Sequence, residues 1–467
     1  MIAFADDRSR LVIPRRAFAP AMASRRACEA GVLLGMDLEQ ATPAHAPITL
    51  DLSPGSALAI TGPSGSGKST LLADLARSAE DSGWRIVRVG AGRLRSLAAI
   101  DLVPGGTESA MRMLARVGLG EARAFVRRPW ELSEGQRARL HLAIALARCE
   151  RVRTDAPVLL VADEVGSALD DRAGEAIGAL LRRLRRESDR LRIAIATNRE
   201  RVVQALAPTL HAALDMDGSV SLMRPMPGRA LPSIVVVEGD RDELTMLSGF
   251  HYRPGMPATI DRVLAARDPR DGALLGVLAT SHPTLNARWR RMLWGDRFEI
   301  PDKRARAVKL NRELRTISRV IVDPRVRGLG VAGRLVRAYL RDASTPCTEA
   351  VASMGRVCPF FERAGMRAHR LERSPADAEF LELLEELGVE RWRLAMPRSA
   401  WVRAERAGGR GRVVCALQRW AMSSRRSRGL LEGDVATAFR AACRAVGGES
   451  VVYGWEKERH EATGTWH

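Results

Sequence analysis

Eight consecutive residues near the start of the chain have the types and spacing of a phosphate-binding loop: Gly62, Pro63, Ser64, Gly65, Ser66, Gly67, Lys68 and Ser69. They match the pattern G-x-x-x-x-G-K-[ST] at every fixed position. In such a loop, successive N–H groups converge on the β- and γ-phosphates, the lysine reaches the same phosphates, and the last hydroxyl is a ligand for Mg²⁺. The stretch therefore predicts ATP or GTP binding, with Lys68 catalytic, Ser69 a metal ligand and Thr70 a further contact.

Two more groups of candidate residues follow in the next hundred positions. Asp163 and Glu164 end the apolar strand pattern PVLLVADE. A carboxylate at a strand end beside a phosphate loop can hold the Mg²⁺ shell, which is the role expected of Asp163. Glu164 is placed to polarise the attacking water, so it is the second predicted catalytic residue. The other group precedes an amphipathic helical pattern and consists of Leu132, Ser133, Glu134, Gly135 and Gln136.

The strands and helices that must position these residues alternate along the chain, which is typical of an α/β fold. Residues 56–61 read as a strand and the phosphate loop leads into a helix, while 157–162 and the segment before Asn198 read as further strands. In this order the segments resemble the ABC ATPase family over roughly residues 25–225. The resemblance implies a head-to-tail homodimer in which Ser133 and Gly135 of one copy close on the γ-phosphate held by Lys68 of the other.

Two features depart from the family pattern. Asn198 occupies the γ-phosphate sensor position, where the family usually has histidine, so slow hydrolysis is expected. An aromatic residue that would stack on adenine is not evident before the loop, so the preferred base is left open. Only about 60 residues separate Thr70 from Leu132. That leaves little room for a subdomain that docks on a permease, so a permease partner is not expected and a transporter subunit is the less favoured alternative.

A second glycine-rich turn follows a strand pattern at 316–324 and opens a helical pattern. It consists of Arg327, Gly328, Leu329, Gly330, Val331, Ala332 and Gly333. With the strand order around it, this turn resembles the GNAT acyltransferases over about residues 233–370. The resemblance implies that the turn holds the pyrophosphate of acetyl-CoA or another acyl-CoA, while Ile321 and Val322 face the pantetheine arm. The late-helix tyrosine of many GNAT enzymes is absent from the segment Pro359-Phe360-Phe361, so an inactive fold that only binds is the alternative.

The net charge of +19 favours partners with phosphates. Residues 288–341 carry 16 Lys and Arg against 5 Asp and Glu, a surplus of 11. Trp289, Trp294 and Phe298 are interleaved with this charge and would suit stacking on unpaired bases. The alternatives are a solvated basic surface whose tryptophans face the core, or contacts to the coenzyme. His251 and Tyr252, in a loop, are candidate substrate residues.

Targeting signals and cysteine pairs are not evident. The six cysteines include no C-x-x-C pair, no apolar run approaches ~18 residues, and the first residues are charged where a signal peptide is apolar. We therefore expect a cytoplasmic protein. The predicted domains are an ABC-type ATPase over 1–225, an α+β GNAT-like domain over 233–370, and a helical basic extension over 371–467.

The two glycine-rich turns together are similar to a family of ABC-type ATPases fused to a predicted acetyltransferase domain. The leading interpretation is an ATP-hydrolysing enzyme coupled to acyl-CoA-dependent N-acyltransfer on nucleic acid. The second interpretation is an ATP-switched nucleic-acid-binding module with an inactive GNAT fold. The third is the ATP-binding subunit of an ABC transporter.

Overall fold

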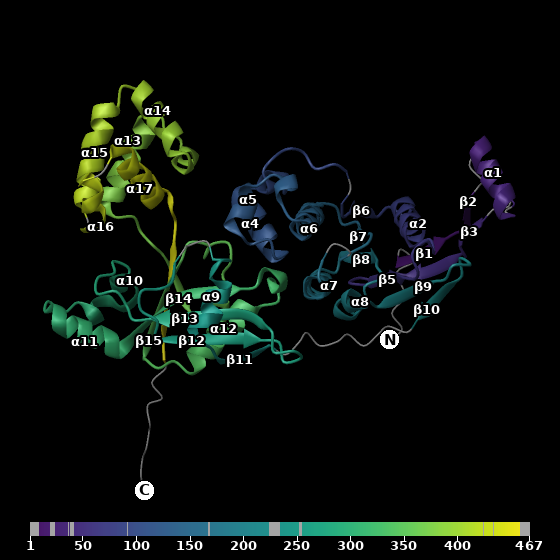
Figure 1. Ribbon diagram of the computed structural model, residues 1–467, viewed down its shortest axis with the longest axis horizontal. Coiled ribbons are helices and arrows are strands. Elements are labelled where there is room, and N and C mark those ends of the chain that lie inside the picture. Colours follow the sequence, from purple (N-terminus) through teal and green to yellow (C-terminus); the bar gives the residue numbers. More distant parts are fainter. Residues whose placement is uncertain are drawn as a thin grey trace, which may run out of the picture. The chain divides into compact units, whose positions relative to one another are not determined.

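The computed structural model describes residues 9–18, 24–35, 37, 42–90, 92–166, 169–223, 234–251, 255–423, 425–432 and 434–457. The chain divides into two compact units, whose helices and strands are labelled in Figure 1. The first consists of Met1–Thr280 with Arg319–Arg341, and the second of Ser281–Ser318 with Asp342–His467. The chain therefore passes between the units three times. These units do not follow the domain boundaries expected at 225, 233 and 370, which stay predictions.

The phosphate loop belongs to a six-stranded sheet of the first unit, with strand order β10-β9-β5-β8-β7-β6. All neighbours are parallel except β10 and β9. The four inner strands are almost wholly buried, which suits a parallel sheet covered on both faces. The bounds are β5 Ala57–Thr61, β6 Arg85–Arg88, β7 Val158–Ala162, β8 Leu191–Ala196, β9 Leu210–Leu214 and β10 Val220–Met223.

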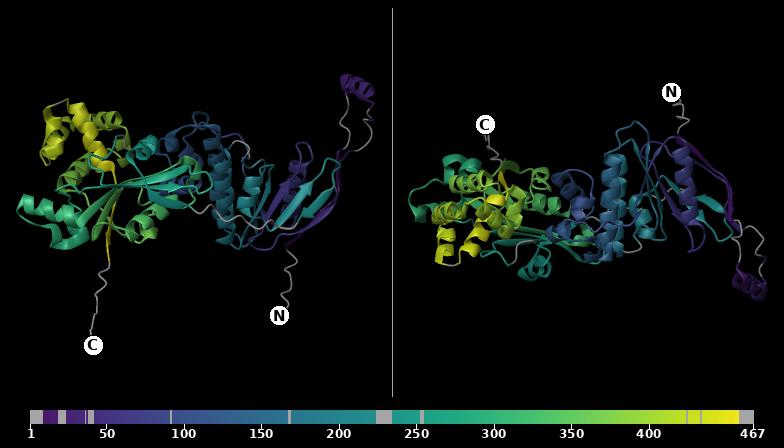
Figure 2. Two further views of the ribbon diagram at one scale, coloured as in Figure 1. Left: turned by 60° about the horizontal axis from the view of Figure 1, so that its bottom comes forward. Right: turned by 90° about the horizontal axis from the view of Figure 1, so that it is seen from above.

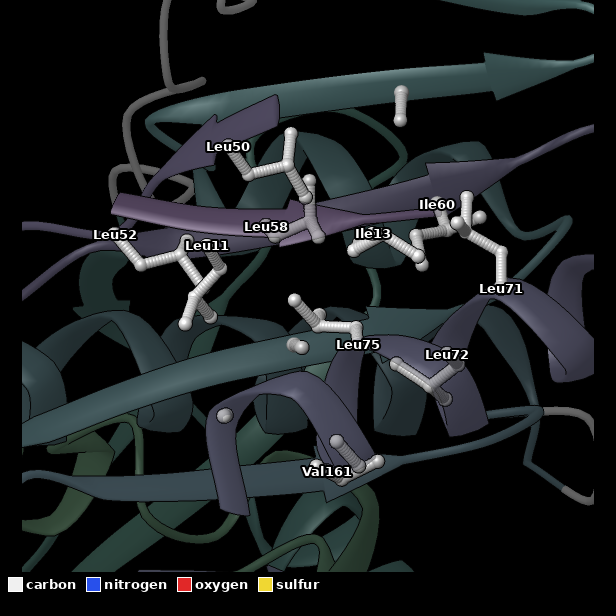
Figure 3. Close-up of a cluster of buried hydrophobic side chains, with 14 of the residues drawn as sticks. Leu11, Ile13, Leu50, Leu52, Leu58, Ile60, Leu71, Leu72, Leu75 and Val161 are labelled. Atoms are coloured by element: carbon white, nitrogen blue, oxygen red, sulfur yellow. The ribbon is translucent and has the colours of Figure 1, made fainter. Parts of the chain in front are cut away.

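Short antiparallel strands near the N-terminus add to this sheet's core. β1 pairs with β4, and β2 pairs with β3. Leucines and isoleucines of β1 and β4 pack with β5 and with helix α2 in one apolar cluster (Figure 3). The bounds are β1 Arg10–Ile13, β2 Arg16–Phe18, α1 Arg25–Leu34, β3 Thr42–His45, β4 Ile48–Asp51 and α2 Lys68–Asp81.

Between β6 and β7 lies a set of helices that ends in the long helix α6. The other long helix, α7, packs along α8. The bounds are α3 Ala99–Leu102, α4 Thr107–Arg116, α5 Ala122–Val126, α6 Glu134–Glu150, α7 Asp171–Arg186 and α8 Glu200–Leu206.

The remainder of the first unit is an antiparallel group, β11-β12-β13, with two helices. Leu244 of α9 packs against Val263, Val277 and Ile321. The bounds are β11 Val235–Glu238, α9 Arg241–Ser248, β12 Arg262–Arg267, β13 Leu274–Ser281, β14 Leu314–Val322 and α12 Val331–Arg341. The strands and the helix expected around the second glycine-rich turn are therefore present.

In the second unit, the first residues of β14 pair in parallel with β15, and β17 pairs antiparallel with both β15 and β16. The last strand, β17, comes from the segment expected to be only helical. This expectation was wrong for residues 451–456, because the short, nearly continuous apolar run VVYGWE, whose first four residues are buried, forms a strand inside the sheet. The bounds are α10 Arg290–Trp294, α11 Lys303–Glu313, β15 Cys347–Ala352, β16 Arg367–Arg370 and β17 Val451–Glu456.

The other helices of the second unit gather in one group in both views of Figure 2. They share their own apolar core, which includes Phe380, Trp420 and Phe439. The bounds are α13 Pro375–Glu386, α14 Pro397–Arg406, α15 Arg410–Met422, α16 Arg425–Arg428 and α17 Val435–Gly447. Within the described ranges, no helix combines the length and the apolar character needed to cross a membrane.

Candidate functional site

Parallel pairing places the predicted ATPase residues along one edge of the six-stranded sheet. The phosphate loop follows β5, Asp163 and Glu164 follow β7, and Asn198 comes just after β8. Because β5, β8 and β7 are parallel neighbours, their carboxyl ends share one edge. Ligand sites of open α/β sheets lie at this edge. The fold thus brings together residues that are 130 positions apart in the sequence.

Glycine is required at several points of the phosphate loop. Gly62, Gly65 and Gly67 have φ angles of 148°, 86° and 92°, in a region that favours glycine. A Cβ on Gly62 would also lie 2.3 Å from the carbonyl oxygen of Leu214 and 2.9 Å from Oγ of Ser66. Ser66 Oγ is buried and, within the described part of the chain, has no hydrogen-bond partner. This tight backbone with an unsatisfied hydroxyl fits a bound phosphate.

Lys68 begins helix α2 and folds back over the loop. Its Nζ donates to the carbonyl oxygens of Gly62 at 2.9 Å and Pro63 at 2.6 Å. Gly67 is the N-cap of α2 and offers no side-chain cap, so the helix N-terminus retains N–H groups for a ligand. Ser69 and Thr70 follow in the first turn. The cation, the N–H groups and the hydroxyls needed to hold a nucleotide and Mg²⁺ are therefore within one turn of chain.

The carboxylate pair after β7 has an unusual backbone. Oδ1 of Asp163 accepts a hydrogen bond from the backbone N of Glu164 at 3.0 Å. Glu164 has a φ of 50° and is, with Ala207, one of two non-glycine residues of positive φ among those described. Such backbone strain clusters at functional sites. Both side chains are exposed, so they are free to face a metal shell and a water molecule.

The segment 132–136 forms the N-terminus of α6. Leu132 is buried, and Ser133 is the N-cap in a capping box with Gln136. Gln136 N donates to Ser133 Oγ at 3.2 Å, and Ser133 N donates to Gln136 Oε1 at 3.1 Å. Glu134 and Gly135 begin the helix. The capping box fixes the direction in which this N-terminus points.

Two hydrogen bonds lie near this edge of the sheet. Thr61 Oγ1 and His211 Nε2 share a hydrogen bond of 2.8 Å between β5 and β9. Burial lowers the pKa of His211 below its usual value. Asn198 is exposed, while the preceding Thr197 donates from Oγ1 to the carbonyl oxygen of Val165 at 3.0 Å. This bond ties the residue before Asn198 to the loop after β7.

The second glycine-rich turn adopts the expected strand–turn–helix form. Gly328 and Gly330 have φ angles of 90° and 80°, and α12 begins at Val331. Ile321 is buried in the apolar cluster with Leu244, and the carbonyl oxygen of Val322 accepts from Arg327 Nε at 3.2 Å. Leu329 and Ala332 are half-buried, and Gly333 is buried.

Several contacts of this turn were not anticipated from the sequence. Arg327 Nη1 lies 3.2 Å from Oε1 of Glu121, and Arg139 Nη1 donates to the carbonyl oxygen of Pro324 at 2.9 Å. Arg139 is buried, and desolvation lowers its pKa, opposed by Asp170 and Glu121. The sequence offered one signal for these contacts: Arg139 comes just before an apolar helical run. An arginine buried there requires a partner for its charge.

The aromatic residues of the basic stretch do not lie as the nucleic-acid interpretation requires. Trp294 and Phe298 are buried in a cluster with Leu310 and Leu314, and Trp289 packs against it. These aromatic rings face the core and are not available to stack on bases, so the alternative of a basic surface over buried tryptophans fits the structure. His251 follows α9 and its N donates to the carbonyl oxygen of Ser248 at 3.0 Å, whereas Tyr252 lies outside the described residues.

Comparison with known proteins defines the class of this chain. The family model described as ABC transporter matches residues 46–92, which include the whole phosphate loop. The methionine import ATP-binding protein MetN of Mesorhizobium japonicum is 32% identical over 291 residues, covering 52% of this chain and 74% of that protein. The taurine import ATP-binding protein TauB of Chromobacterium violaceum is 33% identical, covering 42% and 77%. The chain belongs to the ABC transporter ATP-binding family. It carries an ABC ATPase domain, and domains of this class hydrolyse ATP.

For other relatives, the match covers only a small part of their length. An uncharacterized ABC transporter ATP-binding protein of Mycobacterium tuberculosis is 37% identical over 155 residues, covering 29% of this chain. The chain spans about a fifth, 21%, of that protein's length. A dimeric ATP-binding cassette in a post-hydrolysis state with ADP and Pi matches with a TM-score of 0.36 and 23% identity, over 48% of this chain and 99% of that one.

These findings confirm the ABC resemblance and leave the acyltransferase part a prediction. The matching relatives are named for ATP-binding in import and export, so they give no support to the expectation that a permease partner is absent. The names of these relatives mention neither a GNAT-like fold, nor acyl-CoA, nor a nucleic-acid substrate.

Proposed function

We propose that the protein binds ATP with Mg²⁺ and hydrolyses it at a site completed by a second copy of the chain. One observation carries this proposal: the glycine-rich loop, with Lys68 folded over it, shares a sheet edge with Asp163 and with Glu164, whose φ is positive. The Leu132–Gln136 segment is the element that the second copy would supply.

The chain's own residues divide the work of the reaction. Loop N–H groups and the Lys68 ammonium hold the β- and γ-phosphate oxygens and stabilise the charge that develops on them. Ser69 Oγ and the Asp163 carboxylate would hold Mg²⁺, which would neutralise phosphate charge. Glu164 orients the water and accepts its proton. The Asn198 amide can donate a hydrogen bond to the γ-phosphate but cannot carry a positive charge as histidine can.

Steady-state hydrolysis and nucleotide binding by the purified full chain test this proposal. Glu164→Gln should retain ATP affinity and lose on the order of 10²-fold or more in kcat, since proton transfer is removed. Lys68→Ala should lose both hydrolysis and nucleotide binding. A matched control is Glu80→Gln, an exposed glutamate of α2. Hydrolysis that survives Glu164→Gln unchanged would contradict the role of Glu164.

For the region that contains the second turn, the finer proposal is a GNAT-like fold that binds an acyl-CoA. It is supported by β11-β12-β13 in antiparallel order, by the two glycines of positive φ before α12, and by parallel pairing of β14 with β15. Calorimetric titration with coenzyme A tests it. Absence of binding to wild-type protein, together with normal ATP binding, would remove the acyltransferase and leave the ATPase.

A transporter ATP-binding subunit is the second candidate function, favoured by the names of the relatives. In that case the chain would bind a membrane permease and its hydrolysis would depend on it. Affinity purification from membranes, with Glu164→Gln to hold the ATP-bound state, distinguishes the two. A stoichiometric integral-membrane partner would establish the transporter function.

A further inference from the structure

Inside the first unit, two helices of the ATPase region hold the β-strand region at two separate points. The first point is the turn 323–328, which lies against helices α4, α6 and α7. Arg139 of α6 donates to the Pro324 carbonyl oxygen at 2.9 Å, and Arg183 of α7 donates to the Gly328 carbonyl oxygen at 3.2 Å. A Cβ on Gly328 would lie 2.9 Å from the carbonyl oxygen of Arg116. The turn is therefore packed without spare room.

A short chain of side chains connects this turn to the N-terminus of α6. Gln136 Nε2 donates to Glu121 Oε2 at 2.6 Å, and Glu121 Oε1 receives Arg327 Nη1 at 3.2 Å. Gln136 also closes the capping box with Ser133. The arginine of the glycine-rich turn is thus held by a carboxylate, and that carboxylate is held by a residue of the 132–136 segment.

The second point is the β12–β13 hairpin against α7. Arg270 donates from both terminal nitrogens to Glu175, at 2.9 and 3.0 Å, and also contacts Asp268. Glu175 and Asp268 are 8% and 1% exposed, so both carboxylates need a cation nearby: Glu175 has Arg270, and Asp268 has Arg270 together with Arg172, whose Nη1 lies 3.8 Å away. Arg172, one turn earlier on α7, pairs with Asp271 of the same hairpin.

Both helices begin where the proposed reaction takes place. α6 starts at the 132–136 segment, and α7 starts at Asp171, seven positions beyond Glu164. Arg139 and Glu175 each lie in the second turn of their helix. Because a helix moves as a rigid rod over this distance, a shift of either N-terminus must displace the residues that hold the turn and the hairpin.

We propose that α6 and α7 transmit the nucleotide state of the ATPase to the glycine-rich turn 323–330, with Glu121, Arg139 and Glu175 as positioning residues. In this structure, Glu121 is paired with the guanidinium of Arg327. The arginine is therefore not available to an anion that the turn would bind. Closure of the 132–136 segment on a nucleotide draws Gln136 away from Glu121 and loosens this pairing. The inference rests on the proposed ATPase function and is tested separately from it.

Hydrogen–deuterium exchange of the full chain provides the test. The Glu164→Gln variant is used to hold bound Mg-ATP, and exchange is followed in peptides covering 323–333 and 262–275, with and without Mg-ATP. We expect exchange in both to change about fivefold or more, the scale of a typical coupling between sites. Glu121→Gln, added to Glu164→Gln, should reduce the change at 323–333 while leaving ATP affinity intact, since Arg139 and Arg183 alone would then hold the turn.

Two further variants separate coupling from simple structural damage. The charge swap Glu121→Arg with Arg327→Glu should restore the ATP-dependent change at 323–333, because it restores the ion pair with its polarity reversed. Glu80→Gln is the matched control and should behave as the parent. Failure of the swap together with unchanged folding would overturn the role of the pair.

The possible results divide cleanly. If ATP binds and exchange changes at 132–140 but not at 323–333 or 262–275, the inference is overturned and the ATPase stands. If Mg-ATP does not bind at all, the proposed function fails and the inference fails with it. If both regions respond in the parent and Glu121→Gln reduces the response at 323–333 but not at 262–275, the two contact points act independently as proposed.

Discussion

Arg290 and Glu349 form a buried, bidentate ion pair in the second unit. Nη2 of Arg290 lies 3.0 Å from Oε1 of Glu349, and Nε lies 3.2 Å from Oε2, with 3% and 1% of the two residues exposed. Trp289 Nε1 and Thr316 Oγ1 donate to the same carboxylate at 3.2 and 3.0 Å. Arg290 of the basic stretch is therefore part of a satisfied internal network, and its charge is not offered to a polyanion.

Replacing Arg290 by methionine should destabilise the second unit by about 3–5 kcal/mol, because Glu349 would be left buried without its cation. Urea unfolding, followed by the fluorescence of the neighbouring tryptophans, measures this loss. The exposed pair of Arg419 and Glu379, 2.8 Å apart, is the matched control. Arg419→Met should cost no more than about 1 kcal/mol, and equal losses in the two variants would contradict the argument.

His211 should make the stability of the ATPase region depend on pH. Its folded-state pKa is lowered by burial, so the unfolded state takes up a proton first as the pH falls. The free energy of unfolding should therefore be full above about pH 6.5 and decline below it, by at most about 1.4 kcal/mol per pH unit. His211→Gln should flatten this slope between pH 7 and 5.5, as measured by denaturant unfolding.

Gly178 should not tolerate even a methyl group. A Cβ there would lie 2.6 Å from the carbonyl oxygen of Val202 and 2.9 Å from Cβ of Ala205, so α7 and α8 would have to separate. Gly178→Ala should cost about 1–3 kcal/mol. Gly411, inside α15, has open space at the same atom, and Gly411→Ala should instead stabilise by about 0.5–1 kcal/mol. Thermal unfolding of both variants shows whether the signs differ.

Asn198 should limit the rate of ATP hydrolysis. Asn198→His would place a group that can donate a charged hydrogen bond to the γ-phosphate, and we expect kcat to rise by about tenfold or more with little change in KM. Asn198→Ala is the comparison that removes the donor. If histidine is no faster than alanine, the γ-phosphate is sensed by another residue.

The sequence alone determined the ATPase class and most of its local elements. The phosphate loop, the Asp163–Glu164 pair and the 132–136 segment were predicted because their chemistry depends on short-range spacing and on glycines that local backbone geometry demands. The apolar runs of β5, β7 and β8 were also evident, since buried parallel strands are continuously apolar.

Only the tertiary structure decided which charged residues meet. Glu121 and Arg327 are 206 positions apart, and Glu175 and Arg270 are 95 apart. β17 joins β15 across a gap of about a hundred residues. It also decided that Trp294 and Phe298 are buried, because a mixed aromatic and basic pattern is compatible with either a core or a surface. Spacing along the chain reports local geometry, whereas pairing between distant segments depends on how whole elements pack.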